Sequence, residues 1–132
     1  MKVQTKDLIG PALDWFVAKC CGELYPRGCV RLHSGRLFTI DPGDSETLDA
    51  WRKYEPSTDW AQGGLLIERE NISVGYQGHL GVPLNSLWYA TNRVDACGFG
   101  PTPLIAAMRC YVSKLGDEVE IPDELCGGIH GL

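Results

Sequence analysis

The sequence contains no long apolar run, which limits where the protein can reside. Its apolar stretches, such as 104–108, fall far short of the roughly 20 residues that a membrane-spanning helix needs. Near the start, Lys2 and Lys6 are not followed by the apolar segment of a secretory signal, because Asp7 and the pair Gly10-Pro11 interrupt it. We therefore expect no membrane association and a location in the cytoplasm.

The sequence also has no C-x-x-C pair. Without an export signal, reduced thiols are expected rather than a disulfide framework. Adjacent Cys20 and Cys21 would point to different faces of a helix, which disfavours a shared zinc ion, and the histidines show no metal-ligand spacing. We expect neither a metal nor a cofactor. The six cysteines are Cys20, Cys21, Cys29, Cys97, Cys110 and Cys126.

Clusters of basic residues are missing as well, and the formal net charge is -5. Non-specific binding to nucleic acid needs clustered Lys and Arg that displace counterions from phosphates, so this class of partner is not expected. One small anionic ligand remains compatible with the sequence, because a few backbone N–H groups and one or two arginines can hold a phosphate.

No internal repeat or low-complexity tract is visible, and 132 residues leave no room for a second core. Hydrophobic residues make up 44% and charged residues 22%, which is typical of a globular protein rather than a disordered one. We therefore expect a single domain over residues 1–132.

A first helix is predicted at about 11–21. Pro11 suits the first turn of a helix, and Gly22 supplies a left-handed cap after the last turn. Apolar residues recur at helical spacing in between, at Leu13, Phe16, Val17 and Cys20.

A second helix is predicted at about 102–115. Thr102 is a favourable N-cap, Pro103 suits the first helical position, and Gly116 is the expected C-terminal cap. One apolar face is expected at Leu104, Met108, Tyr111, Val112 and Leu115.

The remaining apolar stretches are short and β-prone. They predict a hairpin from 29–32 and 37–40, a turn at 41–44, and strands at 72–77, 87–91 and 117–121. A short helix is expected within 46–54, a short helix or turn at 65–70, and loops at 78–85 and 97–103. The fold class is therefore α+β: a single small domain with an antiparallel or mixed sheet packed with two main helices.

Three separated blocks carry a family resemblance: 54–64 with 66–70, 100–112 with 114–116, and the opening 1–3 with 10–15 and 17–20. Together they resemble the NinX-like family of small tailed-phage proteins, known mostly as a domain of unknown function. The sequence departs from the family pattern at Leu65, where proline is common, and around 78–85. The resemblance implies an accessory phage protein expressed early in the infected bacterium.

Two glycine-containing segments are candidates for binding phosphate. Gly63-Gly64 and 98–102 are each expected to be a loop that leads into a helix, where backbone N–H groups can approach an anion closely. Neither matches a Walker or Rossmann pattern. The candidate residues are Gly63, Gly64, Gly100 and Thr102, and the alternative is that these glycines only turn the chain and Thr102 only caps its helix.

Trp60 is the aromatic residue best placed to stack on a base, because Asp59 and Gln62 beside it offer hydrogen-bonding groups. Packing in the core is the alternative role. Arg109 lies on the second predicted helix among apolar residues, so its guanidinium must reach water, a carboxylate or an anion.

No catalytic constellation is evident, so we predict no catalytic residues and favour a protein that binds and sequesters a small nucleotide-derived immune signal. A homo-oligomer is possible, because pockets between protomers enclose a ligand more fully. Two alternatives stay open. One is a module that binds a host protein through exposed aromatics, and the other is a small nucleotide hydrolase that uses Asp59 or Glu68.

Overall fold

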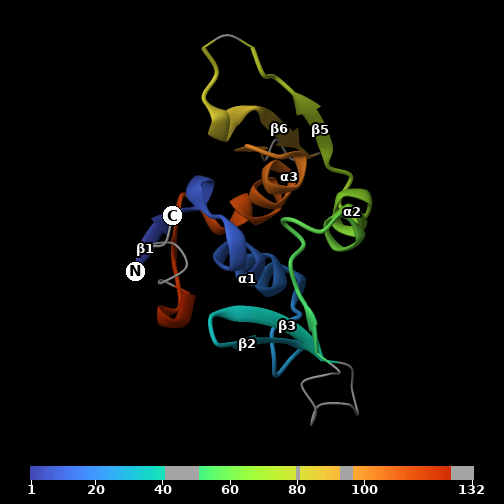
Figure 1. Ribbon diagram of the computed structural model, residues 1–132, viewed down its shortest axis with the longest axis vertical. Helices are drawn as coiled ribbons and strands as arrows, with labels where there is room; N and C mark the ends of the chain where they lie inside the picture. Colours follow the sequence, from blue (N-terminus) through green and yellow to red (C-terminus); the bar gives the residue numbers. More distant parts are fainter. Residues whose placement is uncertain (41–50, 80, 93–96, 126–132) are drawn as a thin grey trace.

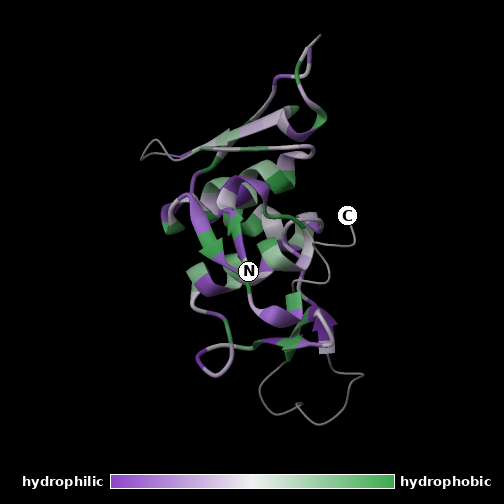
Figure 2. Ribbon diagram, turned by 90° about the vertical axis from the view of Figure 1, so that its left-hand side faces the viewer, coloured by the Kyte–Doolittle hydropathy of each residue, from purple (hydrophilic) through white to green (hydrophobic). Residues whose placement is uncertain are grey.

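The computed structural model describes residues 1–40, 51–79, 81–92 and 97–125. Its helices α1 and α3 lie side by side in the middle of the molecule, with one three-stranded sheet beyond each of them (Figure 1). The side view keeps this order, and apolar segments recur along the central helices (Figure 2). Within the described residues, no helix is long and apolar enough to cross a membrane.

Helix α1 (Gly10–Cys21) confirms the prediction for 11–21. Pro11 lies in its first turn, and the helix ends at Gly22, which has a φ of 72° in the left-handed region. The Gly22 N–H donates to the carbonyl oxygens of the last turn. Its buried side chains form the core face: Ala12, Leu13, Asp14, Phe16, Val17 and Ala18.

Helix α3 (Pro103–Val112), continued by the 3-10 turn η4 (Ser113–Leu115), confirms the prediction for 102–115. Every α3 residue from Leu104 to Val112 is buried, so the helix has no solvent-facing side where one apolar face was expected. The reason is tertiary, because α3 packs against α1, against α2 (Trp60–Arg69) and against the sheet that contains β6 and β7. A helix that is buried all round is the central element of its domain.

Three separate antiparallel sheets make up the β part of the α+β fold, where one sheet was expected. Their orders are β1-β8, β2-β3-β4 and β5-β6-β7. The strands are β1 (Lys2–Gln4), β2 (Val30–His33), β3 (Arg36–Ile40), β4 (Trp51–Lys53), β5 (Ser73–Tyr76), β6 (Trp88–Thr91), β7 (Cys97–Gly100) and β8 (Glu118–Glu120). The predicted hairpin and the predicted strands at 72–77, 87–91 and 117–121 are thereby confirmed.

Strand β7 corrects the prediction of a loop at 97–103. Gly98 and Gly100 are buried on the face of β7 that packs against α3, whereas Cys97 and Phe99 point outward. A Cβ on Gly98 would overlap the backbone atoms Ala106 O and Cys110 N. Alternate glycines therefore let this strand approach the helix that follows it at close range.

Two further predictions need correction. In the described part of 46–54, Trp51–Lys53 is strand β4 paired with β3 rather than a helix, and the predicted turn at 41–44 lies outside the described residues. Helix α2 begins at Trp60, so Gly63 and Gly64 lie inside a helix and not in a loop before one. Packing of α2 against α3 supports the helix despite its two glycines, whose propensity is low.

Candidate functional site

The start of α2 is fixed by two polar side chains. Asp59 Oδ1 accepts a hydrogen bond from Ala61 N at 3.0 Å. Gln62 Oε1 accepts from Glu55 N at 2.9 Å, while Gln62 Nε2 donates to Lys53 O at 2.9 Å and to Asp59 Oδ2 at 3.0 Å. These bonds tie the segment that follows β4 to the first turn of α2.

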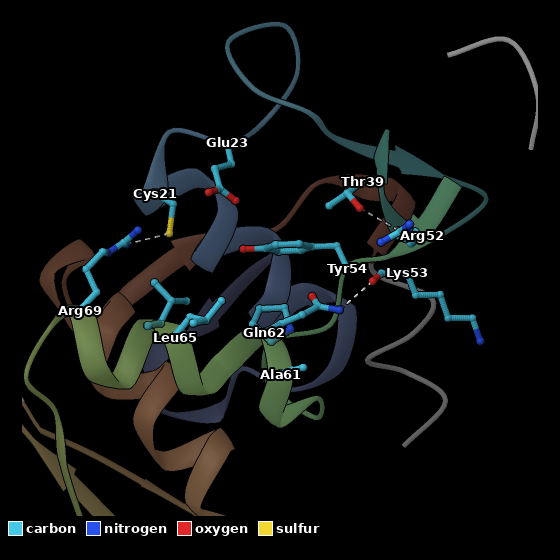
Figure 3. Close-up of a pocket in the computed structure, with 12 residues that line it drawn as sticks. Cys21, Glu23, Thr39, Arg52, Lys53, Tyr54, Ala61, Gln62, Leu65 and Arg69 are labelled. Carbon is cyan, nitrogen blue, oxygen red and sulfur yellow. Dashed lines mark hydrogen bonds between the residues drawn. The ribbon is translucent and has the colours of Figure 1, made fainter. Parts of the chain in front are cut away.

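A cavity of about 410 Å³ lies beside this segment, and we call it the α2 pocket (Figure 3). It is bounded by one face of α2, by the end of α1 and by strands β3 and β4. Its lining includes Cys21, Arg52, Tyr54, Gln62, Leu65 and Arg69. Positions 62, 65, 66 and 69 share one side of a helix, which explains how α2 supplies a continuous wall.

Tyr54 forms the centre of the α2 pocket. Its side chain is only 9% exposed, and its hydroxyl points into the pocket toward Cys21 and Glu23 (Figure 3). This hydroxyl has no hydrogen-bond partner among the described residues. Burial raises the pKa of Tyr54 above its ordinary value, so the hydroxyl remains a donor at neutral pH.

Arginines stand at both ends of the pocket, with Arg69 near the end of α1 and Arg52 on β4 (Figure 3). Arg69 Nη2 donates to Cys21 Sγ and to Tyr111 Oη, each at 3.4 Å, and its Nε donates to Glu70 at 3.3 Å. The bond to Cys21 raises the pKa of Arg69, so its guanidinium stays charged. Arg52 is exposed and free to move toward a ligand.

Of the predicted site residues, the structure places Gln62 in the wall of the α2 pocket. Trp60 is 57% exposed and lies about 200° around the helix from Gln62, on another flank. Gly64 shares that flank, because a Cβ built on it would lie 3.9 Å from the Trp60 ring. Gln62 therefore lines the α2 pocket, whereas Trp60 lies on a different flank of α2.

The other residues that were predicted to bind phosphate take part in helix packing or capping. A Cβ on Gly63 would overlap Pro56 O and come within 2.6 Å of Leu104 Cδ2, so this glycine permits α2 to pack closely on its neighbours. A Cβ on Gly100 would lie 2.8 Å from Ala106 N. Thr102 Oγ1 accepts from Ile105 N at 3.2 Å and caps α3.

Arg109 lies away from the α2 pocket and is only 3% exposed. Its Nε donates to Leu8 O at 2.8 Å, and its Nη1 donates to Asn85 Oδ1 at 3.0 Å and to Phe99 O at 2.8 Å. Burial lowers the pKa of this guanidinium, and the charge of Asp7 opposes that effect. The carbonyl and amide oxygens around it connect the segment before α1, strand β7 and the segment before β6.

Sequence reasoning did not assign Arg52 or Leu65 to a site, and it ranked Tyr54 below Trp60 as a stacking group and Arg69 below Arg109 as an anion-binding group. The sequence did contain a local signal for the α2 wall of the pocket. It places Gln62 three residues after Asp59, which is the pattern of a helix start. That start places Gln62, Leu65 and Arg69 on one helical side. The contribution of Tyr54 and Arg52 had no comparable signal, since it depends on how β4 lies against α2.

Comparison with known proteins identifies a family for the chain. A family model described as Bacteriophage P22, NinX matches residues 4–114, which is most of the 132-residue chain. A search of curated proteins returns no match.

Proposed function

The chain belongs to the NinX family of bacteriophage proteins, and from this premise we propose that it binds a small nucleotide-derived ligand in the α2 pocket and sequesters it without catalysis. The observation that carries the proposal is the Tyr54 hydroxyl, which extends from a buried side chain to the surface of the pocket, has no partner among the described residues and points into a pocket flanked by two arginines. In the infected bacterium, such a ligand would be a nucleotide that signals an immune response.

The size and surface of the pocket suit a mononucleotide. About 410 Å³ lies within the range of roughly 300–1,000 Å³ found for small-molecule sites. Pro56, Leu65 and Leu66 supply apolar surface, and the Tyr54 ring supplies a planar surface for a base. Of these, Leu65 is 68% exposed, so apolar surface of its side chain can be buried when a ligand binds.

The charges around the pocket favour an anion. Arg69 is held in place by Cys21 and Tyr111, while Arg52 at the opposite end is free to adapt. Guanidinium groups bind phosphate oxygens with two parallel N–H donors. Tyr54 adds a neutral hydroxyl donor between them. This arrangement offers local positive charge within a protein whose formal net charge is -5.

Substituting Arg52 with Met is expected to weaken nucleotide binding about tenfold, because one charge-assisted contact to phosphate is lost. Arg27→Met is the matched control, since Arg27 is also exposed but does not line the pocket. Affinity is measured by isothermal titration after a thermal-shift screen of nucleoside monophosphates, cyclic nucleotides and ADP-ribose-type ligands, with phosphate-free nucleosides for comparison.

Leu65→Trp is a second variant for the same titration. The indole is expected to fill the pocket and abolish binding while Leu65, being exposed, tolerates the change. Equal affinity in Arg52→Met, Leu65→Trp and the unmodified protein would refute the proposal. Turnover of a bound nucleotide would favour the hydrolase alternative instead, and Glu23 is the one carboxylate among the described residues that line the pocket.

The alternative of a module for a host protein is favoured by a separate observation. Tyr89 and Phe99 lie opposite each other on neighbouring strands, on the outer face of sheet β5-β6-β7, and are 38% and 43% exposed. Exposed aromatic side chains are frequent anchors of protein interfaces. If no nucleotide raises the melting temperature, while a host protein co-purifies and is lost with Phe99→Ser, this alternative is the correct one.

A further inference from the structure

A second cavity, of about 590 Å³, opens along strand β7, and we call it the β7 cleft. Its walls come from β7, from the 3-10 turn η1 (Thr5–Asp7), from the end of α3 and from the start of β8. Its lining includes Lys6, Phe99, Arg109, Asp117 and Glu118. None of its lining residues lines the α2 pocket, so the two cavities are distinct.

Arg109 is a buried cation without an ion-pair partner among the described residues. All three of its hydrogen bonds go to neutral oxygens, two carbonyls and one amide. A buried charge is costly unless an opposite charge compensates it. Asp7 supplies only a longer-range compensation, and burial lowers the pKa of the Arg109 guanidinium.

One end of the guanidinium is available to the cleft. A guanidinium carries five N–H donors, and the hydrogen bonds of Arg109 engage the one on Nε and both on Nη1. Nη2 has no partner among the described residues, and Arg109 lines the cleft. Three hydrogen bonds therefore hold the Arg109 side chain in place, and the two N–H donors on Nη2 are unpaired among the described residues.

Two further donors lie nearby. Strand β7 is the edge strand of its sheet, so only one of its edges pairs with β6. The Phe99 carbonyl accepts a hydrogen bond from Arg109 and therefore lies on the other, unpaired edge. In an antiparallel strand the N–H and the carbonyl of one residue point to the same edge, so the Phe99 N–H also faces the cleft. Lys6 adds an exposed ammonium group on the η1 wall.

We propose that the β7 cleft is a second ligand site, which binds one oxyanion group, a carboxylate or a phosphate, on Arg109 Nη2, the Phe99 N–H and Lys6. The negative charges of Asp117 and Glu118 on the cleft wall repel any further negative charge on the ligand. The rest of the ligand is therefore neutral or cationic, as in an amino acid or the end of a peptide. A nucleoside polyphosphate, in contrast, is disfavoured here.

The test is a titration of the full-length ¹⁵N-labelled protein, followed by NMR, with three probes: inorganic phosphate, acetate and glycylglycine. Saturable shifts are expected for the amides of Lys6 and Phe99 and for the Arg109 side chain, with none at Gln62 or Leu65 in the α2 pocket. Glycylglycine is expected to bind most tightly, because its ammonium group faces Asp117 and Glu118. Stronger binding of phosphate would identify a phosphate-bearing ligand at the same site.

Lys6→Glu keeps the structural bonds of Arg109 intact and is expected to weaken probe binding about tenfold, through one lost attraction and one added repulsion. Lys2→Glu is the matched control, because Lys2 is exposed nearby on β1 but does not line the cleft. The proposal is overturned if no probe gives saturable shifts at Phe99 and Lys6, or if both variants lose affinity equally. Arg52→Met is expected to leave probe binding in the β7 cleft unchanged. The test of the β7 cleft is therefore independent of the test of nucleotide binding in the α2 pocket.

Discussion

Alanine in place of Gly63 is expected to lower the free energy of unfolding by about 2–3 kcal/mol, whereas alanine at the adjacent Gly64 is expected to raise it by about 0.5–1 kcal/mol. A Cβ at Gly63 meets the Pro56 carbonyl, which is backbone and cannot move aside, as well as Leu104 Cδ2. A Cβ at Gly64 makes only an ordinary contact with the Trp60 ring. At Gly64 the gain in helix propensity is therefore unopposed.

Urea unfolding of the two variants and the unmodified protein measures both effects under one set of conditions. The opposite signs are the decisive feature, since the two residues are neighbours in one helix and the substitutions are identical. Stabilisation by Gly63→Ala would mean that α2 does not pack on Leu104 as described. Destabilisation of similar size at both positions would mean that the segment around Gly64 is not helical.

Replacing Asp14 with Asn is expected to stabilise the protein by about 4 kcal/mol at pH 8 and to change its stability little at pH 4. Asp14 is only 3% exposed on α1, and its Oδ1 accepts a hydrogen bond from Ser57 N at 2.8 Å. Burial raises its pKa from 3.8 to about 7, the hydrogen bond from Ser57 N opposes that shift, and the charge of Glu55 adds to it. An Asn side chain keeps the acceptor and removes the titration.

The sign follows from proton binding. Between pH 3.8 and about 7 the folded protein holds a proton on Asp14 that the unfolded chain has released, so stability is highest below this window and falls as the pH rises through it. Each unit of pKa shift corresponds to about 1.4 kcal/mol, which gives roughly 4 kcal/mol over the window. The asparagine variant lacks this loss.

Chemical denaturation of both proteins from pH 4 to pH 8, together with an NMR titration of the Asp14 carboxyl carbon, checks the prediction. A midpoint near 7 is expected for the carboxyl group. Arg36 and Lys53 line the same cavity of about 310 Å³ as Asp14, and their charges can approach an ionised carboxylate. A midpoint near 4, with parallel stability curves for the two proteins, would show that these cations compensate the buried charge.

Local sequence signals were enough to predict the helices and the hairpin, because residues at the ends or turns of these elements mark their boundaries. Pro11 and Gly22 define α1, and Thr102 and Pro103 define the start of α3, through contacts within a few residues. The hairpin of β2 and β3 likewise depends on neighbouring residues, including Ser34 and Gly35 with positive φ in its turn. The α+β class follows from these elements.

Glycine was the residue type that local reasoning interpreted least well. Gly63 and Gly100 have the same propensity for a loop as any glycine, yet each is placed where a helix or strand must approach another backbone closely. Whether a glycine turns the chain or permits close packing depends on a neighbour that is distant in sequence. Asp59 likewise has a role that depends on its neighbours, because it caps α2, while its contact with a ligand stays a prediction.

The sequence by itself determined the two main helices, most of the strands, the α+β class and the resemblance to the NinX family, because these depend on local patterns. The tertiary structure alone decided where the cavities lie. Arg69 meets Cys21 across 48 positions to close one end of the α2 pocket, and Arg109 meets Leu8 across 101 positions beside the β7 cleft. Such contacts arise only when packing brings distant segments together, and no pattern of neighbouring residues encodes that juxtaposition.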